Sequence, residues 1–201
     1  MISLTGLERR ALLILFKDFA TLYNGSLLSA RLGCSRMGAL KLLRRLEAAG
    51  LVAPQSVGRT KVFRLTWRND CCQTLLAFLL LDEAEGFRRW KEDFRELGRK
   101  AEILVFFGSA VSGEEKAHDV DLLVIAPARE KISSLVQRRQ ALMAKRLHVI
   151  RITREELVAN LRDRNPAAIE ILRTGIILFG QEKLIGVIQD VTGERPDAVV
   201  P

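Results

Sequence analysis

The segment from residue 103 to 125 constrains the fold more than any other part of the chain. Ile103–Phe107 is a continuous apolar run, which predicts a buried β-strand, and Gly108-Ser109 follows it directly. After nine further residues, Asp119-Val120-Asp121 leads into a second apolar run at 122–125. We therefore expect two buried strands, with small and acidic residues where the first strand ends and the second begins.

The polar residues of this segment have the chemistry of a phosphate and metal site. Gly108 has no side chain to keep the backbone away from a phosphate, and the Ser109 hydroxyl and nearby amides can donate hydrogen bonds to phosphate oxygens. Asp119 and Asp121 are two residues apart, so on a strand their side chains lie on one face. Two adjacent carboxylates repel each other unless a cation lies between them, and Mg²⁺ prefers oxygen ligands.

This motif resembles a known family signature. The stretch FFGSAVSGEEKAHDVDLLVI is similar to the signature of the DNA polymerase β-type nucleotidyltransferase superfamily, and it looks most like the small minimal nucleotidyltransferases of archaea and bacteria. The resemblance covers about residues 100–185, because Asn165, Pro166 and a short strand at 176–179 are similar to the end of those domains. It implies that the Gly-Ser turn holds a nucleoside triphosphate and that the aspartate pair holds Mg²⁺.

Two positions depart from the family pattern. The resemblance implies a third catalytic carboxylate on a later strand, acting as metal ligand and general base. When the sequences are aligned on the TREEL segment after that strand, the position is occupied by His148. In addition, Ser112 stands where relatives often have an arginine, which we expect to contact phosphate.

Three interpretations of His148 remain open. It acts as the catalytic base of a modified site, since a neutral imidazole can accept a proton, although it is a poor magnesium ligand. Alternatively, it marks a site that binds nucleotide and no longer transfers it. In the third interpretation the alignment is shifted or another acid substitutes, with Glu155 and Glu156 nearest; acids at a helix start more often interact with the helix dipole.

The positive charge of the chain lies entirely in its first third. Residues 1–68 contain 12 Lys and Arg against 3 Asp and Glu, a net charge of +9, whereas the remaining residues carry 20 basic and 21 acidic side chains. Such an asymmetry points to an anionic partner for the first segment, with double-stranded DNA the leading candidate. A solvated basic face without a partner is the alternative.

Three helices and a hairpin are predicted in this basic segment. Apolar spacing indicates a helix over about 5–20 with Thr5 and Glu8 as a capping box, then a short helix over 26–32 that Gly33 ends. A third helix extends from its Ser35 cap through Ala49, with apolar positions facing inward and basic ones on the polar side. Two short strands, 51–53 and 61–66, follow around a turn at 54–59.

This order of elements is typical of a winged helix-turn-helix, and residues 27–52 resemble the MarR-like and ArsR-like regulators. In that motif the third helix enters the major groove and the hairpin tip contacts the phosphate backbone. The alternative is a domain that mediates protein contacts only. We expect DNA binding, by these residues: Ser35, Arg36, Lys41, Arg44, Arg59 and Lys61.

A helical connector is expected over 69–100, as one or two helices from about residue 72 to 99. Its apolar residues are too many for a free-standing helix and need a partner surface, either the adjoining domain or a second copy of the chain. A homodimer is therefore expected. The residues concerned are Leu75, Leu76, Leu79, Leu80, Phe87, Trp90 and Phe94.

The domain organisation predicted from the sequence is an α/β (α+β) chain of three parts. These are a winged helix-turn-helix domain at 1–68, the connector at 69–100 and a nucleotidyltransferase-like domain at 101–201, with a mixed sheet flanked by helices. The three cysteines have no metal-ligand spacing and cannot form a disulfide framework. With no apolar run long enough to span a membrane and no signal peptide expected, we expect a cytoplasmic protein.

Two functions are consistent with the sequence. The first is a DNA-binding transcriptional regulator whose second domain binds nucleoside triphosphate and Mg²⁺, with nucleotide-binding or residual transfer activity. The second is an active magnesium-dependent nucleotidyltransferase. By family analogy its acceptor is a small molecule or a partner toxin protein, as in antitoxin nucleotidyltransferases, and the winged helix is then an autoregulatory module.

Overall fold

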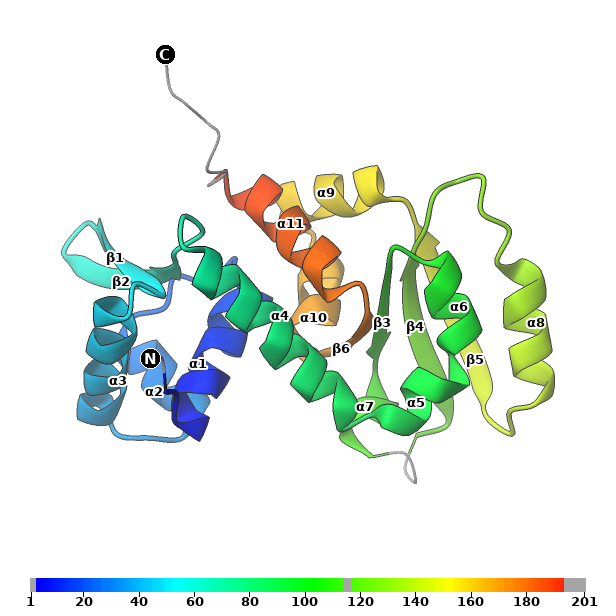
Figure 1. Ribbon diagram of the computed structural model, residues 1–201, viewed down its shortest axis with the longest axis horizontal. Helices are drawn as coiled ribbons and strands as arrows, with labels where there is room; N and C mark the ends of the chain where they lie inside the picture. Colours follow the sequence, from blue (N-terminus) through cyan, green and yellow to red (C-terminus); the bar gives the residue numbers. More distant parts are fainter. Residues whose placement is uncertain (1–2, 114–116, 194–201) are drawn as a thin grey trace, which may run out of the picture. The chain divides into compact units, whose positions relative to one another are not determined.

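The computed structural model describes residues 3–113 and 117–193 (Figure 1). The chain divides into two compact units. The first contains the described residues up to Leu79 together with residues 192–193, and the second is Leu80–Val191. The division therefore falls inside helix α4 (Asp70–Glu85), within the connector expected from the sequence.

Three helices of the first unit confirm the expected elements: α1 (Gly6–Lys17), α2 (Gly25–Leu32) and α3 (Arg36–Ala48). Thr5 and Glu8 form the predicted capping box, and Gly33 ends α2 with a φ of 68°. Helix α1 is shorter than the predicted span to residue 20. It ends early because the Asp18 carboxylate accepts hydrogen bonds from the side chains of Thr21 and Tyr23, which hold the following segment in a turn.

The hairpin consists of β1 (Val52–Val57) and β2 (Thr60–Leu65), joined by a two-residue turn at Gly58 and Arg59. The predicted turn over 54–59 is therefore wrong, because Pro54 lies in β1 opposite Phe63. The Phe63 amide donates to the Tyr23 carbonyl on its other side, so Pro54 sits at a position where the pairing requires no amide hydrogen. Gly58 has a φ of 57°, which tight hairpin turns require.

The second unit is built on a four-stranded mixed sheet in the order β5-β4-β3-β6. Strands β4 and β5 are parallel, and the other two pairings are antiparallel. Both β4 and β5 begin earlier than the sequence indicated, at Asp119 and Arg146. The strands are β3 (Ile103–Phe107), β4 (Asp119–Ile125), β5 (Arg146–Ile152) and β6 (Ile176–Phe179).

Helices connect and cover these strands. A single-turn helix, α7 (Ser109–Ser112), follows β3. The others are α8 (Ser133–Ala141), α9 (Arg154–Arg162), α10 (Pro166–Thr174) and α11 (Gln181–Thr192). Asn165 caps α10 through two backbone amides, with Pro166 as the first helical residue, as predicted. None of the helices in the described parts of the chain combines the length and hydropathy that a membrane crossing requires.

The segment predicted as one or two connecting helices is three: α4, α5 (Arg88–Asp93) and α6 (Arg95–Lys100). Figure 1 shows α5 and α6 against one face of the sheet. The chain bends between α4 and α5 because Trp90 packs on Phe106 of β3, with ring centroids 4.9 Å apart. Trp90 and Phe94 thus belong to the core of the second unit, where they contribute to the buried cluster with Leu122 and Val124.

Candidate functional site

The Gly-Ser turn lies directly against one of the aspartates. Strand β3 ends at Phe107, and Gly108 follows with a φ of 80°, a backbone region that favours glycine. A Cβ atom on Gly108 would lie 2.2 Å from Oδ2 of Asp121, which no side chain can tolerate. Ser109 then begins α7, and both residues of the turn are exposed. The turn therefore presents an open backbone surface beside a carboxylate.

The two aspartates lie at the start of β4. Both are half-buried, whereas Val120 between them is completely buried in the core on the other face. The alternation of side chains along the strand places Asp119 and Asp121 on the same face of the sheet, as the sequence predicted. Asp121 is paired with Phe107, the residue before the turn.

His148 lies on the neighbouring strand, β5. The parallel register pairs Asp121 with His148, and Nδ1 of His148 is 3.4 Å from Oδ1 of Asp121. The contact is longer than a normal hydrogen bond between nitrogen and oxygen. The imidazole is 44% exposed and the carboxylate 23% exposed, so solvent reaches both groups. The imidazole of His148 therefore lies beside the Asp121 carboxylate, at the surface of the sheet.

Glu155 and Glu156 lie at the other end of β5. They follow Ile152, which pairs with Ile125 at the end of β4, whereas the aspartates are at its beginning. Glu156 also accepts a hydrogen bond from the backbone amide of Thr153 in a capping box at the start of α9. The structure therefore does not bring either glutamate to the aspartate pair.

The donor set fits a magnesium ion that is shared with phosphate. Among the side chains that the structure describes, no group of three His, Cys, Asp or Glu converges as a complete metal site. Mg²⁺ commonly binds through one or two carboxylates, with phosphate oxygens and water completing its octahedron. Asp119 and Asp121 meet that requirement when a phosphate is bound at the adjacent turn, whereas the imidazole of His148 is a poor ligand for this ion.

A family model for the nucleotidyltransferase domain matches residues 87–200. This span is more than half of the 201-residue chain. The chain belongs to the nucleotidyltransferase domain family. No curated protein and no solved structure matches the chain significantly.

The family match begins before the Gly-Ser and Asp motif. It begins at residue 87, before the limit of about 100 expected from the motif, and so includes α5 and α6. Trp90 and Phe94, which were expected in the connector, lie within the matched span. Their aromatic character was a usable signal, since side chains of this size are generally buried in a core.

Two pockets of the nucleotidyltransferase domain lie away from the aspartates. One of about 280 Å³ is lined by α7 and the segment 86–90, and it brings Arg89 to the same hollow as Ser112. The guanidinium of Arg89 lies over the Trp90 ring, 5.6 Å from its centroid. A positive group thus lies near position 112 even though an arginine is absent from the motif there.

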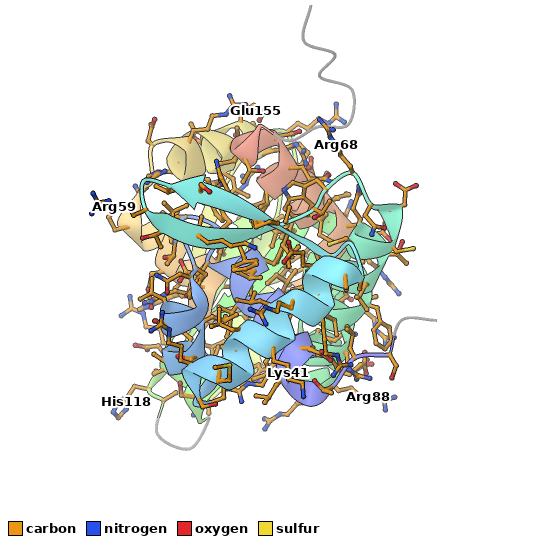
Figure 2. The ribbon with its side chains drawn as sticks, turned by 90° about the vertical axis from the view of Figure 1, so that its left-hand side faces the viewer. Lys41, Arg59, Arg68, Arg88, His118 and Glu155 are labelled. Carbon is orange, nitrogen blue, oxygen red and sulfur yellow. The ribbon has the colours of Figure 1, made fainter. Side chains whose placement is uncertain are left out.

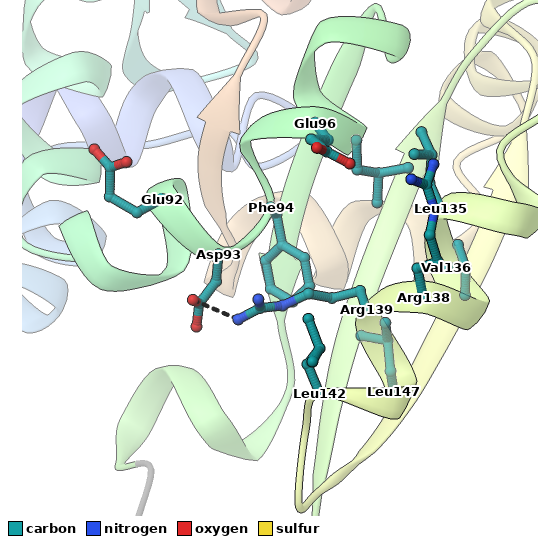
Figure 3. A pocket seen from close by; sticks show the side chains of 11 residues that line it. Glu92, Asp93, Phe94, Glu96, Leu135, Val136, Arg138, Arg139, Leu142 and Leu147 are labelled. Carbon is teal, nitrogen blue, oxygen red and sulfur yellow. Dashed lines mark ion pairs between the residues drawn. The ribbon is translucent and has the colours of Figure 1, made fainter.

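The other pocket, of about 340 Å³, lies between the segment containing α5 and α6 and helix α8. Figure 3 shows Arg139 lying across the Phe94 ring, with its guanidinium paired to Asp93. Leu147 of β5 also lines this pocket, and the adjacent His148 points to the opposite face of the strand. The pocket is therefore on the other side of the sheet from the aspartate pair.

The basic residues expected to contact DNA lie on the surface of the first unit. Arg36, Lys41 and Arg44 are exposed on α3, whereas Ala39, Leu42, Leu43 and Leu46 of the same helix are buried, as predicted. Ser35 accepts a hydrogen bond from the Gly38 amide and so serves as the helix cap. Figure 2 labels Lys41 on α3 and Arg59 at the hairpin turn.

Lys61 has contacts within the hairpin and α3. Its Nζ is 3.8 Å from Oε1 of Glu47 and lies over the Phe63 ring. Arg45 is also engaged, because its Nε lies 3.2 Å from Oε1 of the buried Glu8. For these two residues a contact to a ligand would compete with an existing intramolecular one.

Proposed function

We propose that the nucleotidyltransferase domain binds a nucleoside triphosphate together with Mg²⁺ at the Gly108 turn. The observation that carries this proposal is the close approach of the Asp121 carboxylate to the backbone of Gly108, where a Cβ atom would lie 2.2 Å from Oδ2. A phosphate on the turn would accept hydrogen bonds from Ser109 and nearby backbone amides. Asp119 and Asp121 would hold Mg²⁺ against the same phosphates, where the ion would neutralise charge on the phosphate oxygens.

The nucleotide proposal is tested by calorimetric titration of the full chain with a non-hydrolysable ATP or GTP analogue, with and without Mg²⁺. We expect magnesium-dependent binding that Asp121→Asn weakens at least tenfold. Asp163→Asn is the matched control, because Asp163 is an exposed carboxylate at the end of α9. Equal affinity in the two variants, or binding unaffected by chelation of the metal, would refute the proposal.

We further propose that residues 1–68 form a winged helix-turn-helix domain that binds double-stranded DNA, and that the chain is a transcriptional regulator. The proposal is supported by the net charge of +9 in this segment and by its order of three helices followed by a hairpin. Exposed basic side chains on α3 are available to the major groove, and Arg59 at the hairpin turn is available to the backbone. Lys61 would have to leave Glu47 to take part.

DNA binding is tested with the full chain on a pool of random duplexes, followed by selection of bound sequences. We expect binding that weakens steeply with salt, because basic side chains displace condensed counterions. A regulator that senses nucleotide should also show a changed affinity for its selected duplex when nucleotide and Mg²⁺ are added. Salt-independent binding, or no retention of any duplex at low salt, would contradict the DNA-binding proposal.

A homodimer is also proposed, with α4 as the contact. Phe78 and Leu81, three residues apart on this helix, are 55% and 45% exposed, although Leu76, Leu79 and Leu80 are buried within the chain. A dimer would place two basic domains on a symmetric DNA site. The test is light scattering of the unmodified chain and of Phe78→Glu. We expect a dimer for the unmodified chain and a monomer for the variant. A monomeric mass for both proteins would refute the proposal.

A second candidate function, nucleotidyl transfer, is favoured by the contact between His148 and Asp121. With Nδ1 directed at the carboxylate, Nε2 of His148 is left to accept a proton from an acceptor hydroxyl. The hydroxyl oxygen would form a bond to the α-phosphorus, the bond from that phosphorus to the bridging oxygen would break, and pyrophosphate would leave. The acceptor would be a small molecule or a side chain of a partner toxin protein.

Transfer is tested with α-labelled nucleoside triphosphates, Mg²⁺ and pools of small hydroxyl compounds or cell protein. We expect label on the acceptor and one pyrophosphate released for each transfer. His148→Ala should lower the rate by about 10²-fold or more, the usual contribution of a general base, without weakening nucleotide binding. Pyrophosphate release that is unchanged in His148→Ala would exclude the histidine as the base.

A further inference from the structure

Strand β5 places a second basic side chain beside the aspartate pair. Its parallel register with β4 sets Arg146 opposite Asp119 and His148 opposite Asp121. Because side chains alternate along a strand, all four lie on the same face of the sheet. Of these two pairs, His148 and Asp121 are in contact at 3.4 Å, whereas Arg146 and Asp119 form no ion pair. The aspartates are therefore bordered by basic residues on the β5 side.

Arg146 is one of several arginines of this domain, with Arg129 and Arg138, for which no partner lies among the residues that the structure describes. It is exposed, and within residues 3–113 and 117–193 it makes no hydrogen bond or ion pair. By contrast, Arg151 donates to two backbone carbonyls, and Arg139 and Arg173 are paired with carboxylates. A guanidinium is protonated at any physiological pH, and its planar array of donors matches the oxygens of a phosphate or carboxylate.

The geometry of transfer assigns the two sides of the aspartate pair to different reactants. In a displacement at phosphorus, the attacking and leaving oxygens lie roughly in line. The leaving pyrophosphate would be held at Gly108 and Ser109, next to β3. Since β4 lies between β3 and β5, the acceptor would approach from the β5 side. That side carries Arg146 and His148.

We propose that Arg146 binds a phosphate group on the acceptor, so that the acceptor is a small hydroxyl compound bearing a phosphate. The proposal rests on the transfer reaction described above. A phosphate carries nearly two negative charges and three strong acceptor oxygens, so it binds a guanidinium and a neighbouring basic group more strongly than a singly charged carboxylate does. Arg146 would thus hold the acceptor while its hydroxyl faces the α-phosphorus.

The probe for this site is inorganic phosphate, and its binding to the full chain is measured by calorimetry or phosphorus NMR. We expect Arg146→Ala to weaken phosphate binding at least tenfold, and Arg146→Lys to restore part of it. Arg129→Ala is the control, because Arg129 is an exposed arginine just beyond the other end of β4. Phosphate binding that is equal in the alanine variants at 146 and 129 would overturn the proposal.

The same variants are titrated with the magnesium and nucleotide analogue, which separates this inference from the proposed function. We expect Arg146→Ala to leave nucleotide affinity within about twofold. A parallel loss of nucleotide affinity would assign Arg146 to the triphosphate and overturn the acceptor role. Arg146-dependent phosphate binding in a chain that binds no nucleotide would support the anion site and refute the nucleotide proposal.

Competition identifies the kind of acceptor. We expect glycerol 3-phosphate to displace inorganic phosphate and acetate to fail at equal concentration. Acetate that competes as well as phosphate would show a general anion site and contradict the stated chemistry. A 5′-phosphorylated oligonucleotide that competes 100-fold better than glycerol 3-phosphate would assign the site to nucleic acid and exclude a small acceptor.

Discussion

A Cβ atom on Gly108 would lie 2.2 Å from Oδ2 of Asp121, so only glycine at this position allows the carboxylate to lie against the turn. The backbone of Gly108, with φ 80° and ψ −164°, lies in a region that is essentially restricted to glycine, which adds a cost of about 1–3 kcal/mol for any L-residue. We therefore expect Gly108→Ala to displace Asp121 and to abolish magnesium-dependent nucleotide binding. Calorimetry measures the binding, and thermal unfolding measures the accompanying loss of stability.

Gly113→Ala provides the matched control at the other end of α7. No atom lies within 4 Å of a Cβ built there, and the φ of 165° is extended backbone that any residue adopts. This variant should bind nucleotide as the unmodified chain does. If Gly108→Ala also binds normally, the turn is not the phosphate site.

The second prediction concerns His148, which lies beside Asp121. His148→Asp would place a third carboxylate beside Asp121, at the position that pairs with it across β4 and β5. Because metal affinity rises with the number of charged ligands, we expect magnesium to bind on the order of tenfold more tightly. Without metal, three neighbouring carboxylates repel, so the variant should melt at a lower temperature in chelator and recover when Mg²⁺ is added.

His118→Asp is the control for this charge change. His118 is exposed and precedes β4, next to Asp119 in sequence, so the substitution adds the same charge outside the paired strands. Magnesium should affect its melting temperature as it does that of the unmodified chain. An equal gain of magnesium affinity in both variants would mean that general negative charge, and not the place beside Asp121, controls the metal.

Local signals in the sequence predicted a large part of the fold. The Thr5–Glu8 capping box, the Asn165–Pro166 helix start and the end of α2 at Gly33 depend on residues within a few positions of each other. These features depend on contacts between residues that are close in the sequence, so a local pattern is enough to predict them.

What could not be predicted depends on contacts between distant residues. Pro54 is accommodated in β1 because the amide of its partner Phe63 bonds to Tyr23, some thirty residues earlier in the chain. The bend between α4 and α5 follows from the packing of Trp90 on Phe106. The position of Arg146 opposite Asp119 follows only from the register of β5 against β4. None of these pairings leaves a local pattern in the sequence.

The third prediction addresses the basic surface of α3. Arg36, Lys41 and Arg44 are exposed, and each contact to a DNA phosphate releases about one counterion. Each alanine substitution should therefore reduce the slope of log affinity against log salt by about 1, and the triple variant by about 3. Fluorescence anisotropy of a labelled duplex at several salt concentrations measures the slope.

Arg10→Ala is the control for non-specific loss of charge. Arg10 is exposed on α1, two residues from Glu8, which turns it well away from the side that contacts Arg45 of α3. Its slope should remain that of the unmodified chain. Equal reductions for Arg10 and the α3 residues would show that total charge, and not the α3 surface, determines the affinity.

The fourth prediction is an alkaline loss of stability in the first unit, controlled by Tyr23. Its hydroxyl donates to Oδ2 of Asp18 at 2.6 Å, and burial together with this carboxylate raises the pKa of Tyr23 to about 12. The raised pKa favours the protonated form in the folded state. Its contribution is therefore complete below about pH 10, the ordinary value, and is lost as the pH rises through 12.

Tyr23→Phe should cost about 1 kcal/mol of unfolding free energy at pH 8, because it removes one buried hydrogen bond while Thr21 still donates to Asp18. Denaturant unfolding of the two proteins should show this difference at pH 8 and convergence between pH 10 and 12. Tyr23 is the only tyrosine of the chain, so the absorbance of its phenolate reports its ionisation directly. A midpoint near pH 10, with a stability difference that does not change with pH, would show that the Asp18 contact does not control this group.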